Sequence, residues 1–437
     1  MNRHGKHFIW FILIFVIFAG PVGASTVPKV LHDGKDSHEL AQFIGDRQLL
    51  VLHDSQPLST PNGQREARYV SSMMVVDRPL EDVRRTVTDY GSYPDFLPAL
   101  ENATVSEKKG DTQIVDLAME LRLGVVNPTL YYTLEYYPGK DDDILFRRKK
   151  GDISASYGRW EFRALSDTRT LVAYTNWSDF SNLGLTVDTV LWAQPDLKVA
   201  IPVSQTAVVM KNLREKLVPK SAESKQDSVP NQPDVPLFSQ KPVPQQLINY
   251  TEQGTPMVVH PEQKIREASG DSIGLSFVSA VGVAEGSMKE SKQYLTRFEK
   301  FPDFVDQVYS VQATETDTGY QATWELSMGL GIMSVGINYS LDYSWANDHS
   351  LVFRRTSGDL THVYGALEWV PLEKNRTLFF YTTATQIGEN AGYLMQLGNL
   401  IPNKQIVIGV SAGALAVEKQ INWANEQLNT PRVSSSD

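Results

Sequence analysis

Two histidines are the residues of this sequence best placed for acid–base or metal chemistry. His53 and His260 lie 207 residues apart, and each follows a short apolar segment. Imidazole exchanges protons near neutral pH and is a common zinc ligand. Neither histidine lies in a His-x-x-x-His or Glu-x-x-His pattern, so the spacing gives a metal site little support. The simpler interpretation is a histidine at a strand end with one structural hydrogen bond.

Two Arg-Arg pairs, at 147–148 and 354–355, are the other repeated polar feature. The alternation of polar and apolar residues places Arg148 and Arg355 on the inner, apolar face of their strands. An unpaired charge there would be costly, so we expect an anionic partner. Two candidates stay open. One is the carboxylate or phosphate of a ligand, held in a bidentate pair, and the other is the nearby repeated aspartate, Asp152 or Asp359.

The remaining motifs give no catalytic set. Residues 409–413 read Gly-Val-Ser-Ala-Gly and match the serine-hydrolase pattern in letters. They lie at the start of a predicted helix with no strand before them, and the equivalent segment 202–206 lacks the pattern. The sequence has no cysteine, which excludes disulfides, thiolate metal ligands and a cysteine nucleophile. We therefore predict no catalytic residue, no metal and no cofactor.

The chain contains two copies of one unit. With a shift of 207 residues, 116–175 aligns with 323–382 without a gap, and 20 of those 60 positions are identical. A period this long predicts two domains rather than a solenoid. We predict a first domain at 41–218, a linker at 219–247, a second domain at 248–429 and a tail at 430–437. Because the linker holds six prolines among polar residues, we expect it to be semi-rigid and solvated, without fixing how the domains sit together.

Each copy predicts helices, then strands, then one long helix. The strands alternate with period two in both copies, which indicates an antiparallel sheet covered on one face. The cover is the last helix, whose apolar residues recur every three or four positions; in the first copy Arg214 interrupts this stripe. The fold class is α+β. The inner face predicts a cavity lined by Leu117, Met119, Leu121, Tyr132, Tyr136, Arg148, Trp160, Phe162 and Met210 in the first copy, and by Trp324, Leu326, Met328, Tyr339, Tyr343, Arg355, Trp369 and Val417 in the second.

This order of elements resembles the START-like superfamily, which includes polyketide cyclases and coenzyme Q-binding proteins. The residues that carry the resemblance are the helix start at 79–83, the Tyr-Pro-Asp-Phe-Leu-Pro segment at 93–98, Trp-Glu-Phe at 160–162, and the long last helix. The second copy departs from it, with Ser287 in place of proline. The resemblance implies two tandem helix-grip domains, each a curved antiparallel sheet wrapped around its C-terminal helix. It also implies an apolar ligand between sheet and helix, in carriers and in enzymes alike.

The N-terminus is typical of a secretory signal. Arg3 and Lys6 precede an apolar run at 8–19, and small residues follow up to Ala24. We predict cleavage after Ala24 and a periplasmic or secreted protein, with an uncleaved anchor as the alternative. The net charge of −10 argues against a nucleic-acid partner.

Three functions remain open at this stage. The first is a carrier of a hydrophobic small molecule or lipid, with transient membrane contact and no covalent chemistry. The second is an enzyme of the polyketide cyclase or aromatase type, which would need an acid–base pair in the cavity, such as Arg148 with Tyr136 or Glu161. The alternation places Glu161 and Glu368 on the outer face, which weakens that hypothesis. The third is a structural or interaction protein whose cores are filled solid.

Overall fold

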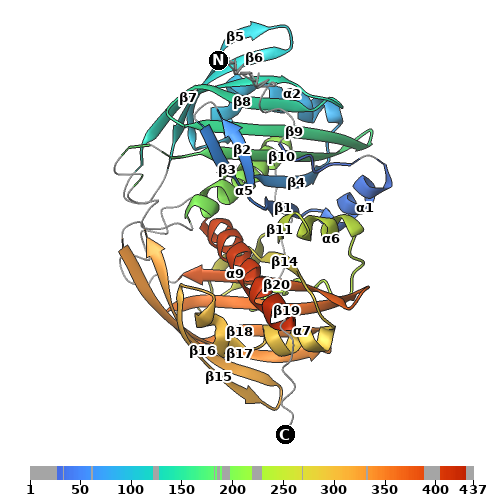
Figure 1. Cartoon of the computed structure of the whole chain (residues 1–437), viewed down its shortest axis with the longest axis vertical. Helices are drawn as coiled ribbons and strands as arrows, with labels where there is room; N and C mark the ends of the chain where they lie inside the picture. The colour runs from blue at the N-terminus through green and yellow to red at the C-terminus, as the bar shows by residue number, and fades with distance from the viewer. Residues whose placement is uncertain are drawn as a thin grey trace, which may run out of the picture.

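The structure is a computed structural model with two similar units stacked along its long axis (Figure 1). It describes residues 27–32, 34–60, 63–121, 127–181, 183–184, 188, 197–218, 229–267, 269–330, 333–387 and 404–429. The predicted signal sequence at 1–24 and the tail at 430–437 lie outside these residues.

The first unit begins with a helix and a short strand, before the strands and helices that the alternation predicts. The elements are α1 (Lys35–Ile44), β1 (Gln48–His53), β2 (Gln56–Thr60), β3 (Gly63–Ala67), β4 (Val70–Val76), α2 (Leu80–Thr88), the 3-10 helix η1 (Tyr90–Ser92), α3 (Tyr93–Phe96), β5 (Leu100–Lys109), β6 (Thr112–Glu120), β7 (Thr129–Pro138), β8 (Ile144–Gly151), β9 (Ala155–Ser166), β10 (Arg169–Asp179) and α5 (Leu197–Leu217).

The second unit repeats this order. Its elements are α6 (Gln245–Thr251), β11 (Gly254–Val259), β12 (Gln263–Arg266), β13 (Ser272–Leu275), β14 (Val278–Ala284), α7 (Met288–Leu295), the 3-10 helix η2 (Phe298–Asp303), β15 (Val308–Thr316), β16 (Gly319–Leu330), β17 (Met333–Asn347), β18 (Ser350–Gly358), β19 (Leu360–Leu372), β20 (Arg376–Ile387) and α9 (Lys404–Asn429). Ser287 and Glu290 form a capping box at the start of α7, as their spacing predicts.

The two units share one sheet of 16 strands. Its order is β15-β16-β17-β18-β19-β20-β14-β11-β1-β4-β10-β9-β8-β7-β6-β5, and neighbouring strands in it are antiparallel. The units meet where β1 pairs with β11, and Leu50 lies opposite Met257, its own equivalent in the repeat. A residue that pairs with its equivalent marks a local two-fold axis. The sheet therefore fixes the relative position of the domains, which the linker composition could not predict.

The long helices α5 and α9 cover the concave face, and they contact each other near the two-fold axis (Figure 1). The stripe predicted for α9 is buried from Val410 to Ala424. In α5, Arg214 interrupts the equivalent stripe. Its guanidinium donates to the carbonyls of Asp46 and Arg47, at 2.6 and 2.8 Å. Gly409 starts the Gly-x-Ser-x-Gly string, and a Cβ there would lie 2.9 Å from Val278. The glycine at 409 therefore lets α9 pack closely against Val278 of β14.

The prediction that the sheet is covered on one face is wrong for its central strands. A second buried layer lies on the convex face, where α1 and α6 pack over β1, β11 and their neighbours. Extended segments before these helices complete it. Phe238, within the segment predicted to be a solvated linker, is fully buried and stacks on Phe380 with ring centroids 4.6 Å apart. Apolar residues therefore lie on both faces of the central strands, as an all-apolar strand such as Leu49–Leu52 requires.

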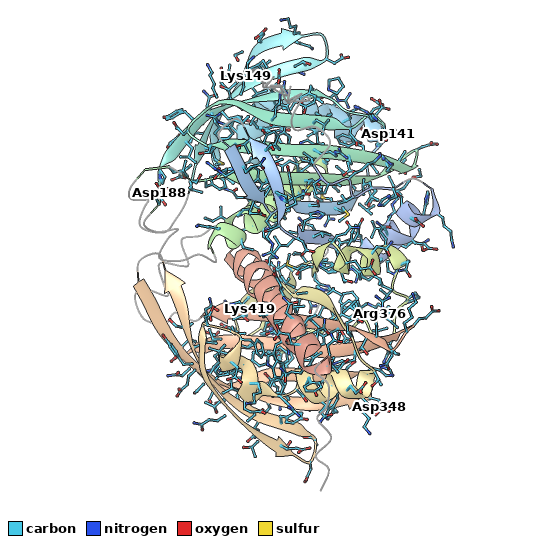
Figure 2. The ribbon with its side chains drawn as sticks, viewed as in Figure 1. Asp141, Lys149, Asp188, Asp348, Arg376 and Lys419 are labelled. Atoms are coloured by element: carbon cyan, nitrogen blue, oxygen red, sulfur yellow. The ribbon has the colours of Figure 1, made fainter. Side chains whose placement is uncertain are left out.

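Contacts across the axis also join the units. Arg68 of the first unit pairs with Glu418 of α9 at 2.5 Å, and the Tyr250 hydroxyl donates to the Val30 carbonyl at 2.7 Å. Charged side chains such as Asp141, Lys149 and Asp348 lie on the outside of the molecule, as does Lys419 on the outer side of α9 (Figure 2). The polar surface thus encloses three apolar layers: the two helices, the sheet, and the convex-face cover.

Candidate ligand cavities

The side chains predicted to line the first cavity come together under α5. Leu117, Tyr136, Trp160, Phe162 and Met210 are buried in one apolar cluster. An adjoining cluster at the other end of the strands contains Leu121, with Met119 and Tyr132 partly buried against it. Strands β6, β7 and β9 thus place alternate residues on one face, as their polarity predicts.

The equivalent side chains of the second unit gather under α9. Trp324, Tyr343, Trp369 and Val417 are buried in one cluster, and Leu326 and Tyr339 pack against it. The side chain of Met328 lies outside the described part of the chain. The inner faces of both units therefore carry the predicted mixture of aromatic and aliphatic residues.

Four half-buried tyrosines occupy equivalent positions in the two units. Tyr132 and Tyr174 lie on the inner face of the first unit, and Tyr339 and Tyr381 repeat them with the same shift of 207 residues. Burial raises the pKa of each phenol. The two phenols of a unit are close enough that the pKa of Tyr174 is raised further by Tyr132, and that of Tyr339 by Tyr381.

These tyrosines keep accessible surface although their hydroxyls are desolvated. Neighbouring inner residues such as Phe146 and Val172 keep almost none. These four tyrosines are therefore less tightly packed than the residues around them. Tyr132 and Tyr339 are among the predicted inner-face residues, whereas Tyr174 and Tyr381 are not. The identity of Tyr174 and Tyr381 in the repeat is the sequence signal that could have identified them.

Deeper in each unit the predicted tyrosines are packed solid. Tyr136 stacks on Tyr90 with ring centroids 4.1 Å apart, and its equivalent Tyr343 stacks on Phe298 at 4.5 Å. Both are buried, and burial holds the pKa of each phenol well above its usual range. Tyr136 and Tyr343 therefore belong to the packed part of each inner cluster.

The repeated arginines take the same position in both units. Arg148 donates from Nη2 to the Gly151 carbonyl at 2.7 Å, and Arg355 donates to Gly358 at 2.8 Å. The described residues contain no ion pair from either arginine to its repeated aspartate, because each aspartate accepts from a backbone N–H on the neighbouring strand instead. The Nε atoms of Arg148 and Arg355 are buried and have no hydrogen-bond partner. The expected internal ion pair is thus replaced by a carbonyl contact.

The histidine pair forms a structural relay on the convex face. His53 Nε2 lies 2.8 Å from Ser71 Oγ, which lies 2.7 Å from Thr175 Oγ1. The second unit repeats the chain through His260, Ser279 and Thr382, at 2.9 and 2.7 Å. Burial lowers the pKa of His53 to about 4 and that of His260 to about 3. Both imidazoles are therefore neutral at pH 7, in line with the structural interpretation.

Glu161 and Glu368 lie on the convex face, where the alternation places them, and both are fully buried. Glu161 accepts from the backbone N–H groups of Val30 and Leu31 at 3.0 and 2.9 Å. Glu368 likewise accepts from Phe238 and Ser239. Burial raises the pKa of Glu161 to about 7. Each glutamate thus holds the extended segment that leads into its unit, and neither reaches the inner face.

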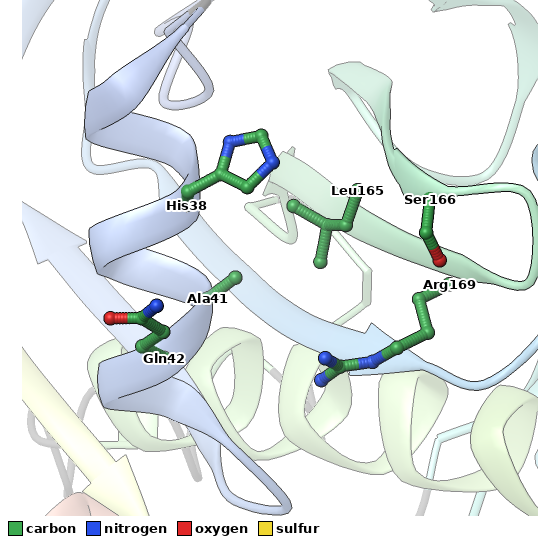
Figure 3. Close-up of a pocket in the computed structure, with 6 residues that line it drawn as sticks. All are labelled: His38, Ala41, Gln42, Leu165, Ser166 and Arg169. Carbon is green, nitrogen blue, oxygen red and sulfur yellow. The ribbon is translucent and has the colours of Figure 1, made fainter.

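A small pocket lies elsewhere, between α1 and the turn from β9 to β10 (Figure 3). Its volume is about 120 Å³, below the roughly 300 Å³ that ligand pockets commonly exceed. Its lining consists of His38, Ala41, Gln42, Leu165, Ser166 and Arg169. His38 contacts the Gly34 carbonyl and Arg169 pairs with Asp77, so its polar groups are engaged.

Among the described residues, no cluster of His, Asp or Glu could hold a metal ion. The helices in that part of the chain are all too short or too polar to cross a membrane.

A family model supports the resemblance in the first unit. The model described as polyketide cyclase / dehydrase and lipid transport matches residues 76–194, from the end of β4 into the segment before α5. No curated protein matches this chain. The description names cyclases, dehydrases and lipid transport together, so it supports a hydrophobic ligand without choosing between them.

Several solved structures are similar to this chain at low identity. The di-domain ARO/CYC StfQ from the steffimycin biosynthetic pathway is 12% identical, with 82% of this chain and 99% of that chain covered and a TM-score of 0.26. The Zhui aromatase/cyclase from Streptomyces sp. R1128 is 17% identical, with 34% and 96% covered and a TM-score of 0.26. The STAR-related lipid transfer protein from Xanthomonas axonopodis is 14% identical, with 37% and 98% covered and a TM-score of 0.28.

The fold and the family match bear on which protein family this chain resembles. Both units wrap an antiparallel sheet around a long C-terminal helix, and the family model lies within the first of them. The resemblance to the START-like superfamily is supported by the family model over residues 76–194, and both units have the predicted α+β helix-grip fold.

Proposed function

We propose that this protein binds a hydrophobic small molecule or lipid in each unit and carries it without covalent chemistry. The observation that supports this most directly is the repeated pair of half-buried tyrosines on each inner face. Their surface is accessible and their phenols are desolvated, which is what the wall of an apolar cavity with a few polar groups provides. The family description supports the same class of ligand.

The driving force is the removal of apolar ligand surface from water. At about 25 cal/mol per Å², a ligand that buries ~300 Å² gains about 7 kcal/mol before the costs of association. The phenols of Tyr132 and Tyr174 then orient the ligand by donating to an oxygen atom on it. No proton needs to move, and burial keeps these phenols protonated at neutral pH.

Mass spectrometry of the purified full-length protein tests the proposal. We expect an apolar compound to copurify, and a lipophilic dye such as N-phenyl-1-naphthylamine to bind to the delipidated protein and be displaced by that compound. Tyr132→Phe with Tyr174→Phe should weaken retention of an oxygen-bearing ligand, whereas Tyr309→Phe, at an exposed position, should not. Protein that is free of lipid and takes up no dye would overturn the proposal.

A cyclase-type enzyme is the second candidate, because the family description names cyclases and dehydrases. Of the acid–base partners expected for it, Glu161 lies on the convex face and Tyr136 is stacked on Tyr90. Only Arg148 keeps a buried nitrogen without a partner. Turnover of a polyketide-like substrate that is lost in Arg148→Ala would favour the enzyme over the carrier.

We also propose that the protein is exported and cleaved after Ala24. The charged start, the apolar run and the small residues before that position support export. N-terminal sequencing of the protein from the periplasmic fraction should start at Ser25. An intact Met1 in a membrane fraction would instead favour the anchor.

A further inference from the structure

The inner faces of the two units exchange one large and one small side chain between two strands. The first unit has Leu117 on β6 and Trp160 on β9. At the equivalent positions the second unit has Trp324 on β16 and Leu367 on β19. All four side chains are buried in the inner clusters of their units. At this pair of positions each unit thus has one indole, on opposite walls. The second unit also buries Trp369 in its inner cluster, where the first has Phe162.

The indole of each unit contacts a different member of the tyrosine pair. Trp160 lies against Tyr174, with ring centroids 4.4 Å apart. Trp324 lies beside Tyr339, with nearly parallel rings 6.5 Å apart. Among the described residues, Tyr132 of the first unit and Tyr381 of the second have no ring contact with an indole. Both units keep the stacked tyrosines Tyr136 and Tyr343.

We infer that this exchange gives the two cavities different ligand selectivity. The ligand in either unit is an apolar molecule with an oxygen acceptor, oriented by Tyr132 in the first unit and by Tyr381 in the second. The indole of Trp160 narrows the first site on its β9–β10 side, and the indole of Trp324 narrows the second on its β16–β17 side. The bulky part of the ligand therefore lies on opposite sides of the ligand oxygen in the two units. This inference rests on the proposed function.

The shape of an apolar pocket distinguishes between similar ligands to a limited extent: one methylene group more or less changes the affinity by about 10- to 200-fold. From the first unit to the second, the side chain on β6 or β16 changes from leucine to tryptophan, and the one on β9 or β19 changes from tryptophan to leucine. Two ligands of different shape should therefore differ in affinity by about tenfold between the two units.

Swap variants of the full-length, delipidated protein test the inference. Leu117→Trp with Trp160→Leu gives the first unit the pattern of the second, and Trp324→Leu with Leu367→Trp does the reverse. Two probes of different shape are titrated by calorimetry: cis-parinaric acid, which is long and thin, and N-phenyl-1-naphthylamine, which is short and broad. For at least one probe, the wild type should show two dissociation constants that differ by about tenfold.

Each swap should merge the two constants into one, and the two swaps should merge them at opposite values. The milder variants Trp160→Phe and Trp324→Phe guard against misfolding, and each should shift only one of the two constants. Trp177→Phe is the matched control, because Trp177 is buried in a different cluster, with Val27 and Leu58, and should leave both constants unchanged. Two constants that stay within twofold of the wild type in all four variants would overturn the selectivity role alone. A wild type that binds neither probe would overturn the proposed function with it.

Discussion

Acidification should destabilise the folded protein through the two buried histidines. His53 and His260 are neutral in the folded state, because burial lowers their pKa to about 4 and about 3. In the unfolded chain their pKa returns to about 6.5. A folded-state pKa below the unfolded value means that the stabilisation is complete above pH 6.5 and is lost as the pH falls towards 4.

The magnitude follows from the size of the shift. One pKa unit corresponds to about 1.4 kcal/mol, and pH 5 lies about 1.5 units below the unfolded pKa. Each histidine should therefore lower the free energy of unfolding by about 2 kcal/mol between pH 7 and pH 5, and the pair by about 4 kcal/mol. The hydroxyls of Ser71 and Ser279, which contact the imidazoles, add no charge that would offset this loss.

Urea denaturation at pH 5, 6 and 7 measures the effect in the wild type and in His53→Gln with His260→Gln. Glutamine places its amide near the position of Nε2 and does not titrate. The double variant should be less stable at pH 7 yet lose about 4 kcal/mol less on going to pH 5. Other titrating groups, including Glu161, are common to both proteins and cancel in the difference. Equal losses in the two proteins would refute the reasoning.

Three further perturbations probe the convex face, the sheet and the junction. The folded-state pKa of Glu161 is raised to about 7 from 4.5. Its contribution to the free energy of unfolding is therefore complete below pH 4.5 and falls by up to about 3 kcal/mol as the pH rises through 7. Glu161→Gln should remove this pH dependence in thermal melts between pH 5 and 8. Gly158→Ala should cost about 1–3 kcal/mol in urea, because the new Cβ would lie 2.0 Å from the Phe146 ring. Arg68→Ala breaks the part-exposed pair with Glu418 and should cost less than about 1 kcal/mol in the same assay.

The sequence predicted the features that depend on local patterns. Alternation on strands such as β6 and β7 assigned the inner and outer faces correctly, down to the outward Glu161. The capping box at Ser287 and the stripe on α9 are equally local signals. These succeeded because each depends on the period of one element, which neighbouring residues fix.

The features that were missed depend on contacts between distant segments. The apolar residues 49–52 pair with β11 of the other unit and with β4, and nothing in their own pattern names those partners. Phe238 lies among prolines and polar residues, and its burial depends on distant residues. Its backbone N–H donates to Glu368, and its ring packs against Phe43 and Phe380. The Arg148 contact with the Gly151 carbonyl depends on the bend at Gly151, whose φ of +115° allows a Cβ-free approach to Tyr132.

The paired sheet bears on the proposed carrier function. A flexible linker would let the units reach different surfaces or move towards each other. Here six residues of β1 pair with β11, α5 packs on α9, and the layer on the convex face is shared, so the units hold one relative position. Two proposed binding sites in a fixed relative position gain nothing from the reach of a linker. A second site is then useful if its ligand selectivity differs from that of the first, and the opposite placement of Trp160 and Trp324 is one difference of that kind.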